Sequence, residues 1–367
     1  MPEQADCGKI IVLTGAGASA ALGMPTMADF PKLIASAGGE LKTLTDGMRW
    51  EEKKEDLEYI YERLELYIEA GQRCAEDGDM NLLQAFGTAE SAATLRSRAT
   101  EALSQLRELI LEKLGEVTRA PNAAVSDYSR VVHKLRKLNG SPLRVFTTNY
   151  DLTFESLTGL SREGALVNGL RPMAEEFRWS RAAYAAAAKD AARVVVYRLH
   201  GCSHWFADEH AGEYDKIVCL RALPKPGKGL RPVVIFPARP KAGGVHANPF
   251  SFAYGELRKA MTAAKLCVVI GYSFRDAGVT EALLSAHRGM RFVIVDPKES
   301  EEVLPRLDQW LTIHVQGEFG KEKVNHCLLS TCEHVLRSDP DGQSETRVPG
   351  GTCTQCDARM RCPDAPI

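Results

Sequence analysis

Three polar side chains that could do chemistry stand directly after apolar runs of the chain. Asn149 and Asp151 follow the run that begins at Leu143, within Thr147-Thr148-Asn149-Tyr150-Asp151, and the alternation places both on one side if the chain is still extended. His200 follows the run that begins at Val194, and Gly201 after it permits close approach. An imidazole suits acid–base work near neutral pH. An amide beside a carboxylate could hold ribose hydroxyls and stabilise positive charge that develops at an anomeric carbon.

Each of these residues also has a structural interpretation. Asp151 could cap a helix that begins at Leu152, with Glu155 nearby. His200 could be a hydrogen-bonded histidine of the core, and His204 is a second, less favoured candidate for the acid–base role. The residue types alone leave these alternatives open.

A glycine-rich turn near the start of the chain predicts a nucleotide site. It follows the apolar run Ile10–Leu13 and has the spacing G-x-G-x-x-A, formed by Gly15, Gly17 and Ala20. Glycines permit a tight turn in which backbone N–H groups approach a pyrophosphate, and a following helix N-terminus adds partial positive charge. A glycine turn after a strand is also often only a turn.

Further apolar runs, separated by helical patterns and glycine turns, predict the sheet that positions these residues. The expected strands lie within 9–14, 143–147, 194–198, 231–236, 266–270, 291–296 and 310–315. Strands that alternate with helices form a Rossmann-like, doubly wound, mostly parallel α/β sheet, in which ligands bind beyond the carboxyl ends of the strands. Gly271, Ser273 and Asp296 stand at such ends and are candidates for phosphate or ribose contacts. Asp296 could equally belong to an Asp-Pro turn.

The expected domain organisation follows from these patterns. Residues 1–30 and 141–320 form the nucleotide-binding domain, and 31–140 form a helical insertion in which apolar residues recur at helical spacing, as from Leu57 to Ile68. The charges of this insertion would form either a solvated face or a protein-contact face. Residues 321–367 form a Cys-rich C-terminal segment.

Composition favours an ordinary globular protein. The 367 residues are 44% hydrophobic and 26% charged, with a formal net charge of −2, so nothing points to nucleic acid or an anionic membrane as the main partner. The sequence has neither an apolar run of about 20 residues, as a membrane span needs, nor the apolar core of a secretion signal. A cytoplasmic protein is expected, and its ten cysteines are expected to be reduced, buried or metal-bound.

The C-terminal cysteines predict a structural zinc site. Cys353 and Cys356 have the C-x-x-C spacing of a zinc knuckle. Cys327 and Cys332 would complete a tetrahedral site, although His326 or His334 could replace one of them. The alternative is a set of surface thiols.

Four motifs of the chain, in order, resemble those of the sirtuin superfamily. They are Gly15–Pro25 (GAGASAALGMP), Thr147–Asp151 (TTNYD), Leu199–Gly201 (LHG) and Gly271–Phe274 (GYSF). With the runs RPVVIF and VIVDP, the resemblance spans nearly all of residues 9–297 apart from the helical insertion. The motif TTNYD is most similar to that of the prokaryotic sirtuin-like NADases of antiphage defence systems.

The resemblance implies which residues would bind NAD+ and act on it. It implies catalytic roles for Asn149, His200 and Asp151, with His200 as general base or ribose orienter. The residues that it assigns to NAD+ binding, together with those expected at the strand ends, are Gly15, Ala16, Gly17, Ser19, Pro25, Thr148, Gly271, Ser273 and Asp296.

The chain departs from the deacylases of the family at two places. Thr26-Met27-Ala28 replaces the Asp-Phe-Arg segment that covers nicotinamide, and only Cys202 and Cys219 lie between His200 and Arg231, where deacylases have two C-x-x-C pairs. These departures argue against a deacylase, and the resemblance implies an NAD+ glycohydrolase that depletes NAD+ in antiphage defence. A deacylase and a non-catalytic NAD+ or ADP-ribose sensor are the alternatives. A homo-oligomer and a partner such as a HerA-like ATPase are expected to regulate it.

Overall fold

The protein is described by a computed structural model that covers residues 8–47, 57–77, 92–115, 122–157, 165–172, 177–187, 190–208, 210, 217–220, 229–236, 248–297, 307 and 310–337. These residues separate into two compact units. The first lies within Met1–Met24, Val117–Val234 and Val245–Ile367, and the second within Pro25–Glu116 and Ile235–Gly244. Across the described ranges, no helix combines the length and the apolar character that crossing a membrane requires.

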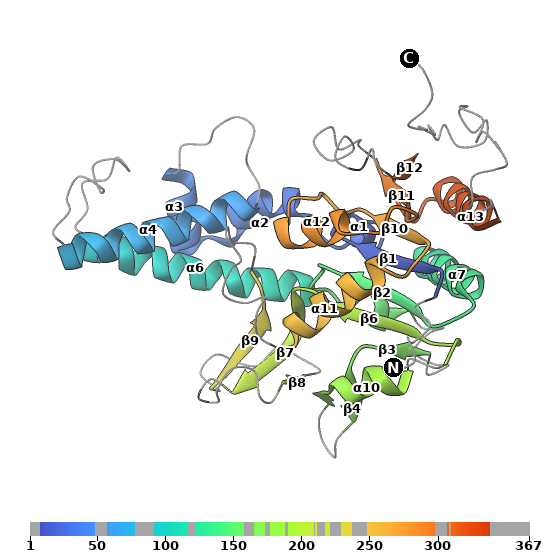
Figure 1. Cartoon of the computed structure of the whole chain (residues 1–367). Coiled ribbons are helices and arrows are strands. Elements are labelled where there is room, and N and C mark those ends of the chain that lie inside the picture. Colours follow the sequence, from blue (N-terminus) through green and yellow to red (C-terminus); the bar gives the residue numbers. More distant parts are fainter. Residues whose placement is uncertain are drawn as a thin grey trace. The chain divides into compact units, whose positions relative to one another are not determined.

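A seven-stranded parallel sheet forms the centre of the first unit (Figure 1). Its order is β12-β11-β10-β1-β2-β6-β3. The strands are β1 (Ile10–Thr14), β2 (Leu143–Thr147), β3 (Leu166–Val167), β6 (Val194–Arg198), β10 (Leu266–Ile270), β11 (Arg291–Asp296) and β12 (Leu311–Gln316). The prediction of a mostly parallel, doubly wound α/β fold is confirmed, as is the last expected strand.

Helices cover both faces of this sheet because its buried strands carry apolar side chains on each face. Ile10 and Val12 of β1 belong to one core, with residues of α7 (Asn122–Asn139) and α13 (Glu322–Arg337). Ile11 and Leu13 belong to the other, with residues of α11 (Phe250–Met261) and α12 (Ala277–Leu284). The alternation of side chains along a strand thus divides one apolar run between two cores.

Strand β1 marks the point at which the chain changes direction across the sheet. It pairs with β2 on one side and with β10 on the other, and all these pairings are parallel. The carboxyl ends of β1, β2 and β10 therefore meet at one edge of the sheet. In open α/β sheets this topological switch point is where ligands bind.

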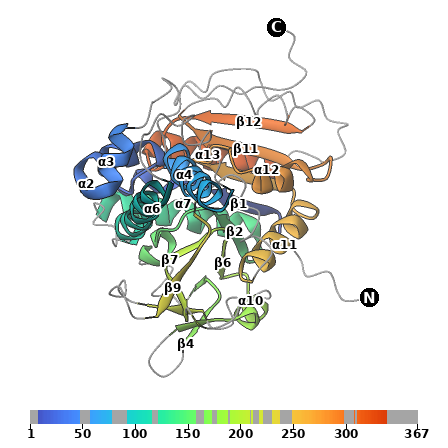
Figure 2. The same cartoon turned by 90° about the vertical axis from the view of Figure 1, so that its left-hand side faces the viewer.

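A second, antiparallel sheet of five strands belongs to the same unit, and Figure 2 shows it on the β6 side of the main sheet, away from β12. Its order is β4-β5-β8-β7-β9. The strands are β4 (Leu170–Pro172), β5 (Phe177–Trp179), β7 (Gly201–Asp208), β8 (Val218–Cys219) and β9 (Leu230–Val234). The run expected as a strand at 231–236 is therefore β9, and it pairs antiparallel with β7 instead of joining the parallel series.

The second unit is helical. It contains the 3-10 helix η1 (Met27–Asp29) and the helices α2 (Phe30–Ala37), α3 (Gly39–Gly47), α4 (Leu57–Asp77) and α6 (Ala92–Gly115). Buried Leu57, Ile60 and Leu64 follow the helical spacing that the sequence predicts. Arg107 of α6 donates from Nε to the Tyr61 hydroxyl of α4 at 2.8 Å, which ties the two long helices together. Helix α7, which lies at 122–139, packs on β1 and β2 in the first unit.

Candidate functional site

The predicted site residues of the first unit lie at the carboxyl edge of the parallel sheet. Gly15 follows β1, Asn149 follows β2, His200 follows β6 and Gly271 follows β10. Backbone bonds connect adjacent loops: Thr148 N donates to Thr14 O at 3.1 Å. The topological switch point therefore carries the groups that the sequence singled out.

The two glycine loops at the switch point interlock. The amides of Gly15 and Gly17 donate to the carbonyls of Ile270 and Gly271, both at 3.0 Å. A Cβ on Gly17 would lie 2.8 Å from Gly271 Cα, so no side chain fits between the loops. These glycines thus serve close packing of one loop on the other. Their contact with a pyrophosphate stays a prediction, and the short helix α1 (Gly17–Ala20), a single turn, contributes little dipole to it.

The loop after β10 has an unusual backbone. Gly271 has a φ of 57°, and a Cβ there would lie 2.4 Å from the amide nitrogen of Ala18. Phe274 also has a positive φ, 58°, which costs a residue with a side chain about 1–2 kcal/mol. The Thr280 hydroxyl donates to the Phe274 carbonyl at 3.0 Å and holds this turn. The turn delivers Asp276 to the start of α12.

Asn149 has a fixed orientation beside the glycine turn. Its Nδ2 lies 2.9 Å from Gly15 O and 3.0 Å from Ser19 Oγ. Because a backbone carbonyl can only accept, the atom that faces Gly15 must be the amide nitrogen. Both amide protons are thereby used, and Oδ1 is the atom of this side chain that could accept a hydrogen bond from a ligand hydroxyl or a water.

Ser19 is buried between the two polar segments. Its hydroxyl bonds Asn149, and the Thr153 hydroxyl lies 3.0 Å from it. Only 1% of the Ser19 residue surface is exposed, so the observed contacts orient Asn149. The predicted role of Ser19 in NAD+ binding stays a prediction.

The alternative in which Asp151 is the N-cap of the next helix is wrong, because Leu152 holds that position; Asp151 instead bonds the backbone at the start of the helix. Its Oδ1 accepts from Thr153 N at 2.9 Å, at the start of α8 (Thr153–Ser156). The residue is 5% exposed. A catalytic role for Asp151 remains a prediction that this geometry does not require.

His200 is held by a carboxylate that the sequence analysis did not single out. Its Nε2 lies 2.8 Å from Asp276 Oδ2 and 3.3 Å from the Tyr254 hydroxyl. Burial, and then the nearby Asp276, raise the pKa of Tyr254, so this hydroxyl keeps its proton. An ionised carboxylate can only accept, so Nε2 carries a proton, and in the neutral ring the lone pair is on Nδ1. The signal that could have found Asp276 is its place right after the GYSF motif.

The other predicted binding residues are placed as follows. Ala16 and Thr148 are half-buried at the switch point, and Ser273 is exposed in the loop after β10. Asp296 ends β11, next to β10, and its carbonyl accepts from Gly317 N. Pro25 begins the second unit, just before η1.

His204 has a structural role. It is buried in β7, and its Nδ1 lies 2.7 Å from the Leu220 carbonyl. Because the carbonyl accepts, Nδ1 carries the proton, and the ring links β7 to the end of β8. Of the two candidate histidines, His200 is therefore the one at the switch-point edge with a carboxylate partner.

Two of the four predicted zinc ligands, Cys327 and Cys332, lie within the described ranges. Cys327 and Cys332 are buried in the core contacts of α13, and burial raises the pKa of the Cys332 thiol to about 12, which favours the thiol over the thiolate that binds zinc. Five residues apart, they point about 140° away from each other around the helix. Cys353 and Cys356 lie outside the described residues. Within the part of the chain that is described, no group of three or more His, Cys, Asp or Glu side chains could hold a metal ion.

Comparisons with known proteins find likeness only in structure. No protein-family model matches the chain, and no curated protein matches it. A Sir2 homologue in complex with ADP-ribose aligns with a TM-score of 0.46 and 18% identity, covering 92% of this chain and 99% of the other. A Sir2 homologue–NAD complex gives 0.46 and 16%, covering 91% and 92%. Sir2Tm bound to a propionylated peptide gives 0.43 and 14%, covering 89% and 93%. All three TM-scores are below 0.5, and all three identities are below 25%.

Proposed function

We propose that this chain is a sirtuin-like NAD+ glycohydrolase, which cleaves NAD+ to nicotinamide and ADP-ribose. The observation that carries the proposal is the fixed orientation of Asn149. Its amide is bonded to Gly15 and Ser19, which leaves Oδ1 to face a ligand at the switch point. The motif order GAGAS, TTNYD, LHG and GYSF supports the same conclusion.

The reaction breaks the bond between the ribose C1′ and the nicotinamide nitrogen. Nicotinamide leaves as a neutral base with the bonding electrons, and C1′ passes through an oxocarbenium-like state, as in glycoside cleavage. The oxygen of water then bonds to C1′, and the water loses one proton. The products are ADP-ribose, nicotinamide and a proton.

Each polar group at the edge has a role in this reaction. Asn149 Oδ1 orients a ribose hydroxyl or the attacking water, and His200 receives the proton on Nδ1, since Nε2–H is bonded to Asp276. Asp276 is then a positioning residue, because it holds the imidazole in one tautomer, as the carboxylate does in other catalytic triads. Asp151 would contribute negative charge near the developing cation.

The surrounding loops supply binding. We assign Gly15, Ala16, Gly17, Ser19, Pro25, Thr148, Gly271, Ser273 and Asp296 to the NAD+ site. The cellular role that we propose is depletion of NAD+ in a bacterial antiphage defence system, in which a homo-oligomer or a HerA-like ATPase subunit controls the activity. Regulation is required since unregulated NAD+ loss would harm the host.

Incubation of the purified chain with NAD+, with and without an acetyl-lysine peptide, tests the proposal when products are followed by mass spectrometry. ADP-ribose and nicotinamide without peptide are expected. Turnover only with peptide would identify a deacylase, and tight binding without turnover would identify a sensor of NAD+ or ADP-ribose.

Two variants connect the activity to the site. Asn149→Ala and His200→Ala are expected to abolish NAD+ loss, while circular dichroism shows that folding survives. Full activity in either folded variant would contradict the assignment. The matched control is His204→Gln, since this buried histidine bonds a backbone carbonyl of the antiparallel sheet.

A further inference from the structure

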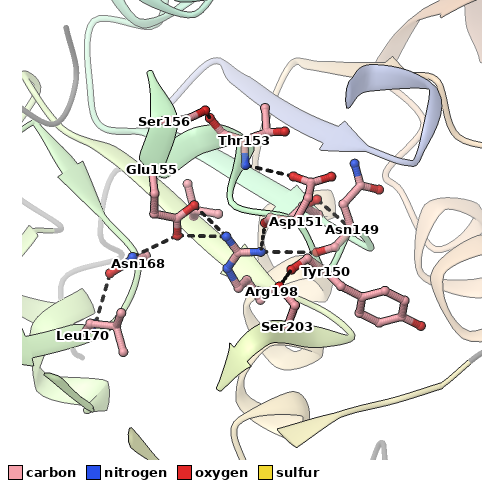
Figure 3. Close-up of polar contacts among 12 residues, drawn as sticks. Asn149, Tyr150, Asp151, Thr153, Glu155, Ser156, Asn168, Leu170, Arg198 and Ser203 are labelled. Carbon is pink, nitrogen blue, oxygen red and sulfur yellow. Dashed lines mark hydrogen bonds and ion pairs between the residues drawn. The ribbon is translucent and has the colours of Figure 1, made fainter. Parts of the chain in front are cut away.

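A buried guanidinium lies directly beneath the loop that carries Asn149 and Asp151. Arg198 is the last residue of β6, two positions before His200, and its side chain is 1% exposed. Its Nη1 donates to the Asn149 carbonyl at 3.2 Å and to the Asp151 carbonyl at 2.8 Å. Figure 3 shows the guanidinium between this loop and Glu155.

Glu155 holds the guanidinium from the opposite side. Arg198 Nη2 lies 2.8 Å from Oε1 and 2.7 Å from Oε2 of Glu155, and Asn168 Nδ2 donates to Oε1 at 3.0 Å (Figure 3). Burial opposes the charged form of Glu155, but the Arg198 charge and these hydrogen bonds outweigh it and hold the pKa of the carboxyl below its usual value. The pair is thus ionised, and both Nη atoms of Arg198 are hydrogen-bonded.

This arrangement requires an arginine. The guanidinium is a rigid planar fork, so one Nη serves two backbone carbonyls while the other serves a carboxylate. A lysine ammonium has the same charge but a single donor atom, and it cannot span both partners. The contacts go to the backbone of residues 149 and 151, so they set the position of the loop and not merely that of one side chain.

We propose that Arg198 is a positioning residue for NAD+ cleavage, which fixes the 149–151 backbone so that Asn149 reaches the ribose while His200 is delivered by the same strand. This inference rests on the proposed function. Asn149 is therefore fixed at both ends: its amide by Gly15 and Ser19, and its carbonyl by Arg198. Displacement of reacting groups by about 1 Å can cost about 100-fold in rate.

The test compares Arg198→Lys with Arg144→Lys. Arg144 is a matched control because it is also a buried arginine at a strand of the same sheet, where it pairs with Glu256 at 3.8 Å, away from the 149–151 loop. In Arg198→Lys, kcat for NAD+ is expected to fall about 100-fold with KM changed less than threefold. In Arg144→Lys, kcat stays within twofold. A folded Arg198→Lys with wild-type kcat overturns the inference.

Hydrogen exchange followed by mass spectrometry separates this inference from the proposed function. Peptides that cover residues 148–153 are expected to exchange faster in Arg198→Lys and at the wild-type rate in Arg144→Lys. If the wild type does not cleave NAD+, the proposed function fails, and the exchange result alone decides whether Arg198 holds the loop. Unchanged exchange in the folded variant overturns it.

Glu155→Gln is a second variant for the case in which Arg198→Lys fails to fold. Glutamine keeps one oxygen acceptor for Nη2 but loses the charge. We therefore expect kcat to fall and exchange at 148–153 to become faster, as in Arg198→Lys, but both changes are expected to be smaller than in that variant. A folded Glu155→Gln that is wild-type in both measurements contradicts the inference.

Discussion

Asp276 contacts His200 with one carboxylate oxygen and caps helix α12 with the other. Oδ2 lies 2.8 Å from His200 Nε2, and Oδ1 accepts from Val279 N at 2.9 Å. The helix cap fixes the rotation of the carboxyl group, and the carboxyl group fixes the imidazole. One side chain therefore links the secondary structure that follows β10 to the imidazole that follows β6.

Asp276→Asn is expected to lower kcat for NAD+ by about 10²–10⁴-fold, because the wrong histidine tautomer is imposed. The amide oxygen must keep accepting from Val279 N, so the NH₂ group faces His200 Nε2 and requires a lone pair there. Steady-state kinetics measure the loss, and ¹⁵N-histidine spectra report the tautomer. Asp276→Ser is the control. A serine can still cap the helix, but it does not reach His200 and so imposes no tautomer on the imidazole. A smaller loss of kcat than in Asp276→Asn is therefore expected. Equal activity in all three proteins would contradict the role of Asp276.

Ser19→Ala is expected to lower kcat about fivefold, since it removes a hydrogen bond worth about 1 kcal/mol that orients Asn149. Thr153→Val serves as the comparison, because the Thr153 hydroxyl contacts Ser19 but not Asn149. Kinetics and thermal unfolding of both variants check the prediction. A larger loss of kcat in Thr153→Val than in Ser19→Ala would show that Ser19 does not orient Asn149.

Gly271→Ala is expected to destabilise the protein by about 3 kcal/mol or more, because the new Cβ would meet the backbone of Gly17 and Ala18 in addition to the cost of a positive φ. Gly140→Ala is the matched control: Gly140 has a φ of 70° with nothing within 4 Å of the added Cβ, so a loss of about 1 kcal/mol is expected. Urea unfolding measures both. Similar losses in the two variants would show that the loops do not interlock.

Glu155→Gln is expected to cost about 3 kcal/mol at pH 7, because Arg198 then remains buried without its charged partner. The folded pKa of Glu155 lies below its unfolded value of about 4.3, so the carboxylate stabilises the fold above that pH and loses its effect as pH falls through the folded pKa. The difference in unfolding free energy between wild type and variant should therefore shrink below about pH 4. Urea unfolding between pH 7 and pH 3 measures it. A difference that is independent of pH contradicts the prediction.

Local patterns predicted most of the parallel sheet and the edge at which its loops meet. The apolar runs before Gly15, Asn149, His200 and Gly271 are each long enough to fill a buried strand, and parallel strands end at one edge. The helix that begins at Leu57 also followed its predicted spacing. These features depend on neighbours in the sequence, so the sequence displays them.

Features that depend on contacts between residues far apart in the chain could not be predicted from local sequence patterns. Strand β9 carries an apolar run like those of the parallel strands, and only its partner β7 shows that it belongs to the antiparallel sheet. Nothing in the sequence next to Asp276 or Arg198 indicates the partner of either side chain. Their partners, His200 and Glu155, lie 76 and 43 positions away along the chain. Cys327 and Cys332 have the residue type of zinc ligands, but their helix directs them into the core.

The double role of Asp276 also has a consequence for the order of synthesis. A ribosome makes residues 15, 149 and 200 before it makes residue 276. A nascent chain whose earlier loops have already left the ribosome therefore has neither the partner of His200 nor the cap of α12. The histidine is fixed only after β10 has joined β1 and α12 has formed. In the proposed NAD+ cleavage, the histidine that handles the proton is therefore fixed only in chains that extend beyond α12.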